Sequence, residues 1–239
     1  MDIRIFNSTE ELSSACAQIF IEQLAKKPSS VLGLATGASP VETYKRLIEA
    51  YSRGEVSFAE ATSFNLDEYC SLARSHPQSY HSFMHANLFD KIDIKSENIN
   101  ILDGNAPDKA AECRRFDEKM EKTGIDLQLL GIGNNGHIGF NEPAESFTEG
   151  SFMVELTEST IAANSRYFPD GDMPRQALTM GIASIMRAKK IVLIAMGEAK
   201  AQAVFDMVKG PVTPACPASV LQNHPDAVIL LDKSAAGLL

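Results

Sequence analysis

The 239-residue sequence has no surplus of basic residues. It holds 22 Lys and Arg against 31 Asp and Glu, which gives a formal net charge of -9 at pH 7. A nucleic-acid partner is not expected, because the anionic phosphate backbone is bound by surplus Lys and Arg. One phosphorylated small molecule remains compatible with this charge, since a few local cations and backbone N–H groups are enough to hold a phosphate.

Long apolar runs and closely spaced cysteines are missing as well. No stretch approaches the roughly 20 apolar residues of a membrane span, and polar residues fill the N-terminus where a signal peptide needs an apolar run. The cysteines form no C-x-x-C pair, so neither a zinc site nor a redox motif is indicated. They are Cys16, Cys70, Cys113 and Cys216. The sequence predicts a cytoplasmic protein with reduced, mostly buried thiols, no metal and no membrane partner.

A linker rich in Pro, Gly or Ser is also absent, which predicts a single domain over residues 1–239. What is present is an alternation of short apolar runs with longer amphipathic stretches. This pattern predicts an α/β fold, an open, mostly parallel, doubly wound sheet with helices on both faces. The predicted strands are residues 3–6, 31–35, 62–66, 127–132, 190–195 and 227–231.

Helix ends carry their own signals. Ser8 with Glu11 forms a capping-box pattern, and Ser39 followed by Pro40 reads as a cap with proline at the first helical position. Two further helices, each stopped by a glycine, are predicted over residues 107–122 and 198–209.

Polar and glycine-rich residues follow four of the predicted strands. In an open parallel sheet, ligands bind in the crevice beyond the carboxyl ends of the strands. We therefore expect these residues to lie along one edge of the sheet. They are Thr36 to Ser39, Asp67 to Tyr69, Gly133 to His137, and Gly197 with Lys200.

The first two groups each allow two interpretations. The stretch Thr36-Gly37-Ala38-Ser39 offers free N–H groups at the start of a helix, which suits a phosphate, but a plain turn and helix cap explain it equally well. Asp67 and Glu68 follow a strand, where either carboxylate could accept a proton. Taken alone, they are better explained as an acidic helix N-terminus.

The run GIGNNG at residues 131–136 matches the dinucleotide motif GxGxxG, which should open a long helix. Here Gly139 and Pro143 follow within two turns, so we reject that interpretation. What remains is a loop carrying Asn135, His137 and Glu142, groups suited to orient, transfer and relay a proton.

Two later cations, Arg166 and Lys200, are candidates for completing a phosphate site, although each alone is more often a surface charge. His81 and His85 stand four residues apart, but no HExxH pattern or third ligand accompanies them. We assign no metal.

Taken together, VLGLATGASP, SFNLDEY, LLGIGNNGHIGFNEP, ANSRYF and ALTMGI resemble the glucosamine-6-phosphate deaminase (isomerase) family, in order and over nearly the whole chain. The resemblance implies conversion of glucosamine 6-phosphate and water to fructose 6-phosphate and ammonia without an organic cofactor. It implies that His137 opens the sugar ring with Glu142 as relay partner, and that Asp67 moves the C2 proton to C1. The implied substrate-binding residues are Thr36, Gly37, Ala38, Ser39, Gly136, Arg166 and Lys200, of which all but Gly136 surround the phosphate.

The sequence departs from the larger, allosteric members of that family. Those members have Asp at position 135, where this chain has Asn135, so Glu142 must carry more of the relay. They also place Arg and Lys at the positions of Phe152 and Val154 to bind an activating sugar phosphate, and their tail is longer. The resemblance therefore implies the shorter type, without allosteric activation, as a monomer or small homo-oligomer.

Residues 147–179 lack a strong core pattern and resemble the family's mobile lid, which would bring Arg166 to the phosphate. Two alternatives stay open. One is a 6-phosphogluconolactonase-like enzyme or another sugar-phosphate isomerase, which an ammonia assay separates. The other is a sugar-phosphate-sensing binding module, against which the Asp67, His137 and Glu142 set and the lack of a helix-turn-helix segment both argue.

Overall fold

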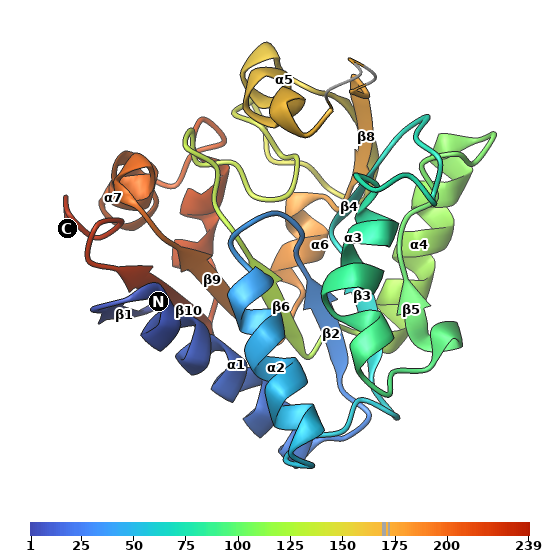
Figure 1. Cartoon of the computed structure of the whole chain (residues 1–239). Coiled ribbons are helices and arrows are strands. Elements are labelled where there is room, and N and C mark those ends of the chain that lie inside the picture. The colour runs from blue at the N-terminus through green and yellow to red at the C-terminus, as the bar shows by residue number, and fades with distance from the viewer. Residues whose placement is uncertain (169–170, 172) are drawn as a thin grey trace.

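A computed structural model describes residues 1–168, 171 and 173–239 of the chain, and its largest feature is an open sheet of seven parallel strands (Figure 1). The strand order is β1-β10-β9-β6-β2-β3-β5, and each neighbouring pair is parallel. The bounds are β1 Asp2–Phe6, β2 Val31–Leu34, β3 Thr62–Asn65, β5 Ile99–Asn100, β6 Leu127–Leu130, β9 Lys190–Ala195 and β10 Ala227–Asp232. The predicted α/β fold and the six predicted strands are confirmed, and within this sheet only the two-residue β5 was not expected.

The central strands are buried on both faces, which explains their continuous apolar sequence. Every residue of β2 and β6 is buried, as are five of the six in β9 and in β10. Helices supply the cover, with α1 and α2 in front of the strands in Figure 1 and α6 behind them. The longer helices are α1 Thr9–Lys26, α2 Val41–Ser52, α3 Tyr80–Asn87, α4 Lys109–Thr123 and α7 Ala201–Lys209. The shorter ones are α5 Glu158–Asn164, α6 Ile182–Met186, η1 Phe89–Lys91, η2 Ser96–Asn98, η3 Ser165–Tyr167, η4 Glu198–Lys200 and η5 Pro217–Asn223.

Helix starts differ in detail from the predictions. The Ser8 hydroxyl caps α1 as expected, by accepting from the Glu11 N–H, but the Glu11 carboxylate accepts from the N–H of Asn7 rather than of Ser8. The predicted Ser39 cap is wrong. Pro40 occupies the cap position of α2, and no side chain caps that helix. The predicted helix 107–122 begins two residues late, because Asp108 is its cap and accepts from the Ala111 N–H.

A second, smaller sheet of three antiparallel strands was not predicted. Its order is β4-β8-β7, with bounds β4 Asp67–Tyr69, β8 Gln176–Thr179 and β7 Phe152–Glu155. Asp67 and Glu68 thus lie on a strand, and the interpretation as a helix N-terminus is wrong. The sheet packs over its own apolar cluster, which includes Tyr69, Phe140 and Phe168.

The predicted lid, residues 147–179, contains β7, α5, η3 and β8. Its residues 169, 170 and 172 lie outside the described residues. In Figure 1, α5 sits above the carboxyl ends of the main strands. Among the described helices, none combines the length and the apolar character that crossing a membrane requires.

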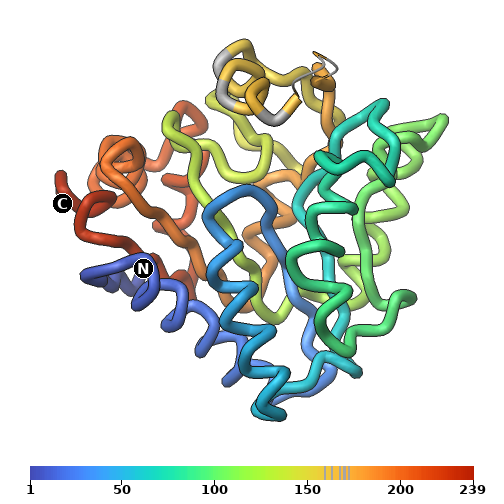
Figure 2. The backbone as a smooth tube through the Cα atoms, viewed as in Figure 1, coloured from blue at the N-terminus to red at the C-terminus, as the bar shows by residue number. Residues whose placement is uncertain are grey.

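The chain path sets where a ligand can bind. From β1 at one edge the chain crosses to β2 in the middle and continues to β3 and β5; β6 then lies on the other side of β2, and the later strands lead back to β1 (Figure 2). The direction of the strand order therefore switches between β2 and β6. Loops that leave such a pair of strands diverge to opposite faces and leave a crevice.

Candidate active site

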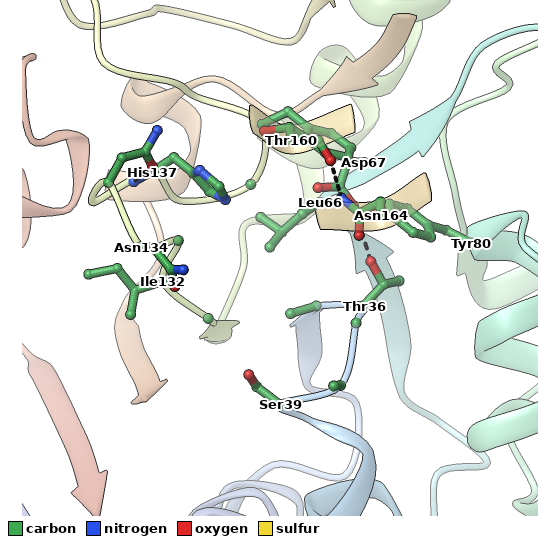
Figure 3. Close-up of a pocket in the computed structure, with 18 of the residues that line it drawn as sticks. Thr36, Ser39, Leu66, Asp67, Tyr80, Ile132, Asn134, His137, Thr160 and Asn164 are labelled. Atoms are coloured by element: carbon green, nitrogen blue, oxygen red, sulfur yellow. Dashed lines mark hydrogen bonds between the residues drawn. The ribbon is translucent and has the colours of Figure 1, made fainter. Parts of the chain in front are cut away.

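A cavity of about 460 Å³ lies at this switch point. Segments that follow β2, β3, β6 and β9 all line it, as expected from the polar residues at those four strand ends. In Figure 3, His137 stands across the cavity from Asp67, and Ser39 lies below them. The volume and the mixed polar and apolar lining suit a small polar molecule.

The turn after β2 contributes Thr36, Gly37, Ala38 and Ser39 to the lining. Gly37 has a φ of +89°, a backbone conformation that other residues rarely adopt. No side chain caps α2, so the first N–H groups of that helix have no side-chain partner, and the turn before it lines the cavity. Free N–H groups at a helix start favour an anion.

Lys200 reaches the same cavity from η4, and burial lowers the pKa of its ammonium group. The turn between β9 and η4, which precedes Lys200, is held in place by Asp232 at the end of β10. The Asp232 carboxylate accepts from the Gly197 N–H at 3.0 and 3.1 Å and from the Ala235 N–H at 2.7 Å. Asp232 therefore holds the segment that presents Lys200.

Asp67 is the buried carboxyl of the cavity, with 6% of its surface exposed. Burial, and next the charge of Glu68, raise its pKa to about 8, while the Thr36 hydroxyl, 3.5 Å from Oδ1, acts in the opposite direction. A carboxyl with a pKa in this range is suited to accept and return a proton near neutral pH.

Glu68 points away from the cavity and anchors the helix beside it. Its carboxylate accepts from the backbone N–H groups of Tyr69, Tyr80 and His81 at 2.8–2.9 Å, the last two at the start of α3. This contact fixes Tyr80, whose side chain lines the cavity and whose hydroxyl lies 3.3 Å from that of Tyr69.

The loop after β6 is shaped by glycines around His137. A Cβ on Gly133 would lie 2.2–2.4 Å from the His137 ring, so only glycine allows the ring to lie there. Gly136 has a φ of +84° and packs against the Cys216 thiol. No long helix follows, which agrees with the rejection of the dinucleotide interpretation. Asn141 closes the loop, since its amide donates to the carbonyls of Ile138 and Met180.

Behind His137 lies Glu142, with a separate set of partners on each oxygen. Oε2 accepts from the Asn135 amide at 2.7 Å and lies 3.4 Å from His137 Nδ1. Oε1 accepts from the Thr160 hydroxyl at 2.6 Å. Although burial opposes the charge, these neighbours, His137 first, lower the pKa of Glu142 to about 2. The pair is therefore an imidazole beside a carboxylate that is ionised at neutral pH.

The structure brings most of the predicted site residues together. Those that line the cavity are Thr36, Gly37, Ala38, Ser39, Asp67, Asn135, His137 and Lys200. Glu142 lies in the layer behind, and Gly136 supports the loop rather than the lining. Arg166 is exposed on η3 and does not line the cavity, so its contact with a phosphate stays a prediction that depends on lid movement.

Tyr80 on α3 and Thr160 and Asn164 on α5 also line the cavity, although the sequence analysis gave them no role in the site. No motif marked Tyr80 or Thr160, whereas Asn164 lies within the ANSRYF string.

His81 and His85 lie outside the cavity, with ring centroids 4.5 Å apart, and His85 Nδ1 is 2.7 Å from Asp90 Oδ1. Within the described residues, no group of three or more His, Cys, Asp or Glu side chains is arranged to hold a metal ion. All four cysteines are free and buried.

Known proteins share both this sequence and this fold. The chain is 52% identical to a glucosamine-6-phosphate deaminase of Thermoanaerobacter pseudethanolicus, covering 100% of this chain and 95% of that one, and 49% identical to one of Clostridium botulinum, covering 100% and 97%. A solved structure of a monomeric glucosamine-6-phosphate deaminase superposes with a TM-score of 0.97 at 44% identity, over the full length of both chains. A 6-phosphogluconolactonase of Trypanosoma brucei shares the fold, with a TM-score of 0.74 at 20% identity and coverage of 100% and 98%.

The model of one protein family matches residues 7–230. With a match of that length and relatives at about half identity over the whole chain, the protein belongs to the glucosamine-6-phosphate isomerase/6-phosphogluconolactonase family.

Proposed function

We propose that this protein is a glucosamine-6-phosphate deaminase, which converts glucosamine 6-phosphate and water into fructose 6-phosphate and ammonia. Full-length relatives with that name, at 48–53% identity, support the activity. The observation that carries the proposal is the cavity itself. A buried carboxyl of raised pKa, Asp67, lies across it from an imidazole backed by a carboxylate, His137 with Glu142.

Ring opening is the first step, and His137 is placed for it. One proton must leave the C1 hydroxyl and another must reach the ring oxygen, so a single group that accepts and then donates is sufficient. The imidazole lines the cavity, while Glu142, ionised behind it, orients the ring and stabilises the imidazolium that forms.

Isomerisation and deamination follow. Asp67 takes the proton from C2 and delivers it to C1, which turns the open-chain aldehyde with a C2 amine into an enolamine and then a C2 imine. Water adds to C2, the C–N bond breaks, and ammonia leaves. Desolvation inside the cavity makes Asp67 more basic than a surface carboxylate, which suits proton abstraction from carbon.

The phosphate supplies binding energy at a distance from the reacting carbons. We place it against the N–H groups of residues 36–39 and the ammonium of Lys200, with Arg166 added when the lid segment closes over the substrate. Hydrogen exchange measures that closure: amides in residues 147–179 are expected to slow when a substrate analogue binds, and unchanged exchange would contradict a lid.

We infer further that the enzyme works in the cytoplasm, as a monomer and without an organic cofactor. The superposition on the monomeric deaminase supports the monomer. Phe152 and Val154 stand where the allosteric relatives carry cations, and Val154 packs on the apolar cluster of the small sheet, so its position serves packing.

The direct test is incubation of the purified protein with glucosamine 6-phosphate in the presence of a chelator, with ammonia and fructose 6-phosphate measured separately. We expect equal amounts of both products. Ketose phosphate without ammonia would indicate a plain isomerase. No turnover of this substrate together with hydrolysis of 6-phosphogluconolactone would replace the proposal with the lactonase activity of the fold's other members.

A further inference from the structure

Helix α5 contacts the proposed relay carboxylate directly. The Thr160 hydroxyl, from α5, donates to Glu142 Oε1 at 2.6 Å, and the Thr157 hydroxyl lies 3.4 Å from the same oxygen. The other oxygen, Oε2, belongs to the loop after β6 through Asn135 and His137. One carboxylate is therefore shared between the lid segment and the catalytic loop.

The geometry around Thr160 makes this contact directional. Thr160 is 6% exposed, and its Oγ1 lies 3.1 Å from the Thr157 hydroxyl, which can donate to it. When Thr160 accepts that bond, its own proton is directed at Glu142. Thr157 caps α5 by accepting from the Thr160 N–H, so the helix start, both hydroxyls and the carboxylate form one hydrogen-bonded unit.

Thr160 also faces the cavity. It and Asn164, one turn later, line the pocket, and the Asn164 amide donates to the Thr160 carbonyl (Figure 3). A sugar that contacts this face of α5 therefore touches the element that holds Glu142 from behind. Movement of α5 by about 1 Å would lengthen the bond to Oε1 beyond hydrogen-bond range and leave the carboxylate held on one side only.

We propose that Thr160 is a positioning residue through which the placement of α5 controls the orientation of Glu142, and so the ring-opening step at His137. With α5 in place, Oε1 is held by Thr160 and Oε2 is turned to Asn135 and His137. With α5 displaced, Glu142 is free to rotate away from the imidazole. The inference rests on the proposed function, because it assigns Glu142 the part of relay partner in ring opening.

The test compares Thr160→Val, which keeps the shape and removes the donor, with Thr160→Ser, which keeps the donor. We expect Thr160→Val to lower kcat by about 10- to 100-fold with KM changed by less than about threefold, because orientation of the acid–base pair and not substrate binding is lost. Thr160→Ser should retain most of the activity. Ile161→Val, which trims the packing of the next residue of α5, is the matched control and should behave as the wild type.

A double-mutant comparison separates positioning from a structural role. In a Glu142→Ala background, Thr160→Val should cause little further loss of kcat and little further fall in Tm, because the acceptor of the Thr160 hydroxyl has already been removed. Equal losses in both backgrounds, a rise in KM instead of a fall in kcat, or full activity of Thr160→Val would each overturn the proposal. Ammonia release by the wild type decides the proposed function separately, and the Tm comparison does not depend on activity at all.

Discussion

Asp67 and Glu68 are neighbours in the sequence, but their side chains point in opposite directions, because successive side chains of the strand β4 lie on opposite faces. Asp67 enters the cavity with a Thr36 hydroxyl 3.5 Å away, whereas Glu68 accepts three backbone N–H bonds and anchors α3. Both carboxyls are buried, yet only Asp67 lies beside space for a substrate. The assignment of the proton-transferring residue therefore depends on strand register, not on residue type.

Replacing Asp67 by Asn should separate activity from stability. The folded chain keeps the Asp67 proton up to about pH 8, whereas the ordinary pKa is 3.8, so unfolding releases a proton between these values and the wild type loses stability as pH rises through them. Asp67→Asn carries no such cost. We expect it to be more stable than the wild type by about 1–4 kcal/mol at pH 7 and equal to it near pH 4.

The same variant should lower kcat by about 10²- to 10⁴-fold while it still binds substrate, since only the proton acceptor is lost. Denaturant unfolding at several pH values, calorimetric binding and an ammonia assay measure the three quantities. Wild-type turnover by Asp67→Asn would refute the role of Asp67, whatever the stability shows.

The pH dependence of the wild type follows from the same carboxyl. Asp67 accepts a proton only when ionised, and with a pKa of about 8 it is mostly protonated at lower pH. We expect kcat/KM to fall by about tenfold per pH unit below that value and to level off above it. Glu142, with a pKa of about 2, should add no limb between pH 5 and 9. A profile that is flat across pH 6–9 would mean that another group takes the C2 proton.

Much of the fold was readable from the sequence because buried parallel strands are continuous apolar runs. The same rule placed the polar residues after β2, β3, β6 and β9 at one edge, and the cavity there was expected for that reason. The three-stranded sheet was not readable: β4 is the polar triplet DEY, and its pairing with β8 joins Asp67 to Thr179, a partner far along the chain. Thr160 was missed for a similar reason, since its bond to Glu142 depends on where α5 packs.

The structure gives Asn135 a hydrogen-bonding role that could not be derived from the sequence. Its amide donates to Glu142 Oε2 at 2.7 Å, a bond that an ionised Asp has no proton to make. We expect Asn135→Asp to place two carboxylates in contact and to lower kcat at pH 7 by about 10-fold or more. Asn135→Ala loses the donor without adding charge and should be less impaired. Rate–pH profiles of both variants provide the comparison, and an Asn135→Asp enzyme as active as the wild type would show that the amide is dispensable.

The side chains at positions 152 and 154 predict how the enzyme responds to an activating sugar phosphate. Val154 packs on the apolar cluster of the small sheet, and neither it nor Phe152 offers a cation to an activating phosphate. We expect a hyperbolic rate curve that N-acetylglucosamine 6-phosphate leaves unchanged, because Phe152 and Val154 provide no cation through which a second phosphate could be bound and coupled to the cavity. Initial rates over a range of substrate concentrations, with and without this compound, measure it. A sigmoidal curve that becomes hyperbolic on its addition would contradict the expectation.

Asp232 is expected to act on phosphate binding without touching the substrate. Its carboxylate holds the N–H groups of Gly197 and Ala235 and thereby the turn that presents Lys200. Lys200→Gln should raise KM by about 10- to 100-fold through loss of a charged hydrogen bond, with a much smaller effect on kcat. Asp232→Asn keeps the shape but weakens both contacts, and should raise KM by less, about 3- to 10-fold. Because the two residues act on one contact, Asp232→Asn should add almost nothing in the Lys200→Gln background. Steady-state kinetics of the two single variants and the double variant measure this, and independent, multiplying effects on KM would show that Asp232 serves only the stability of the sheet edge.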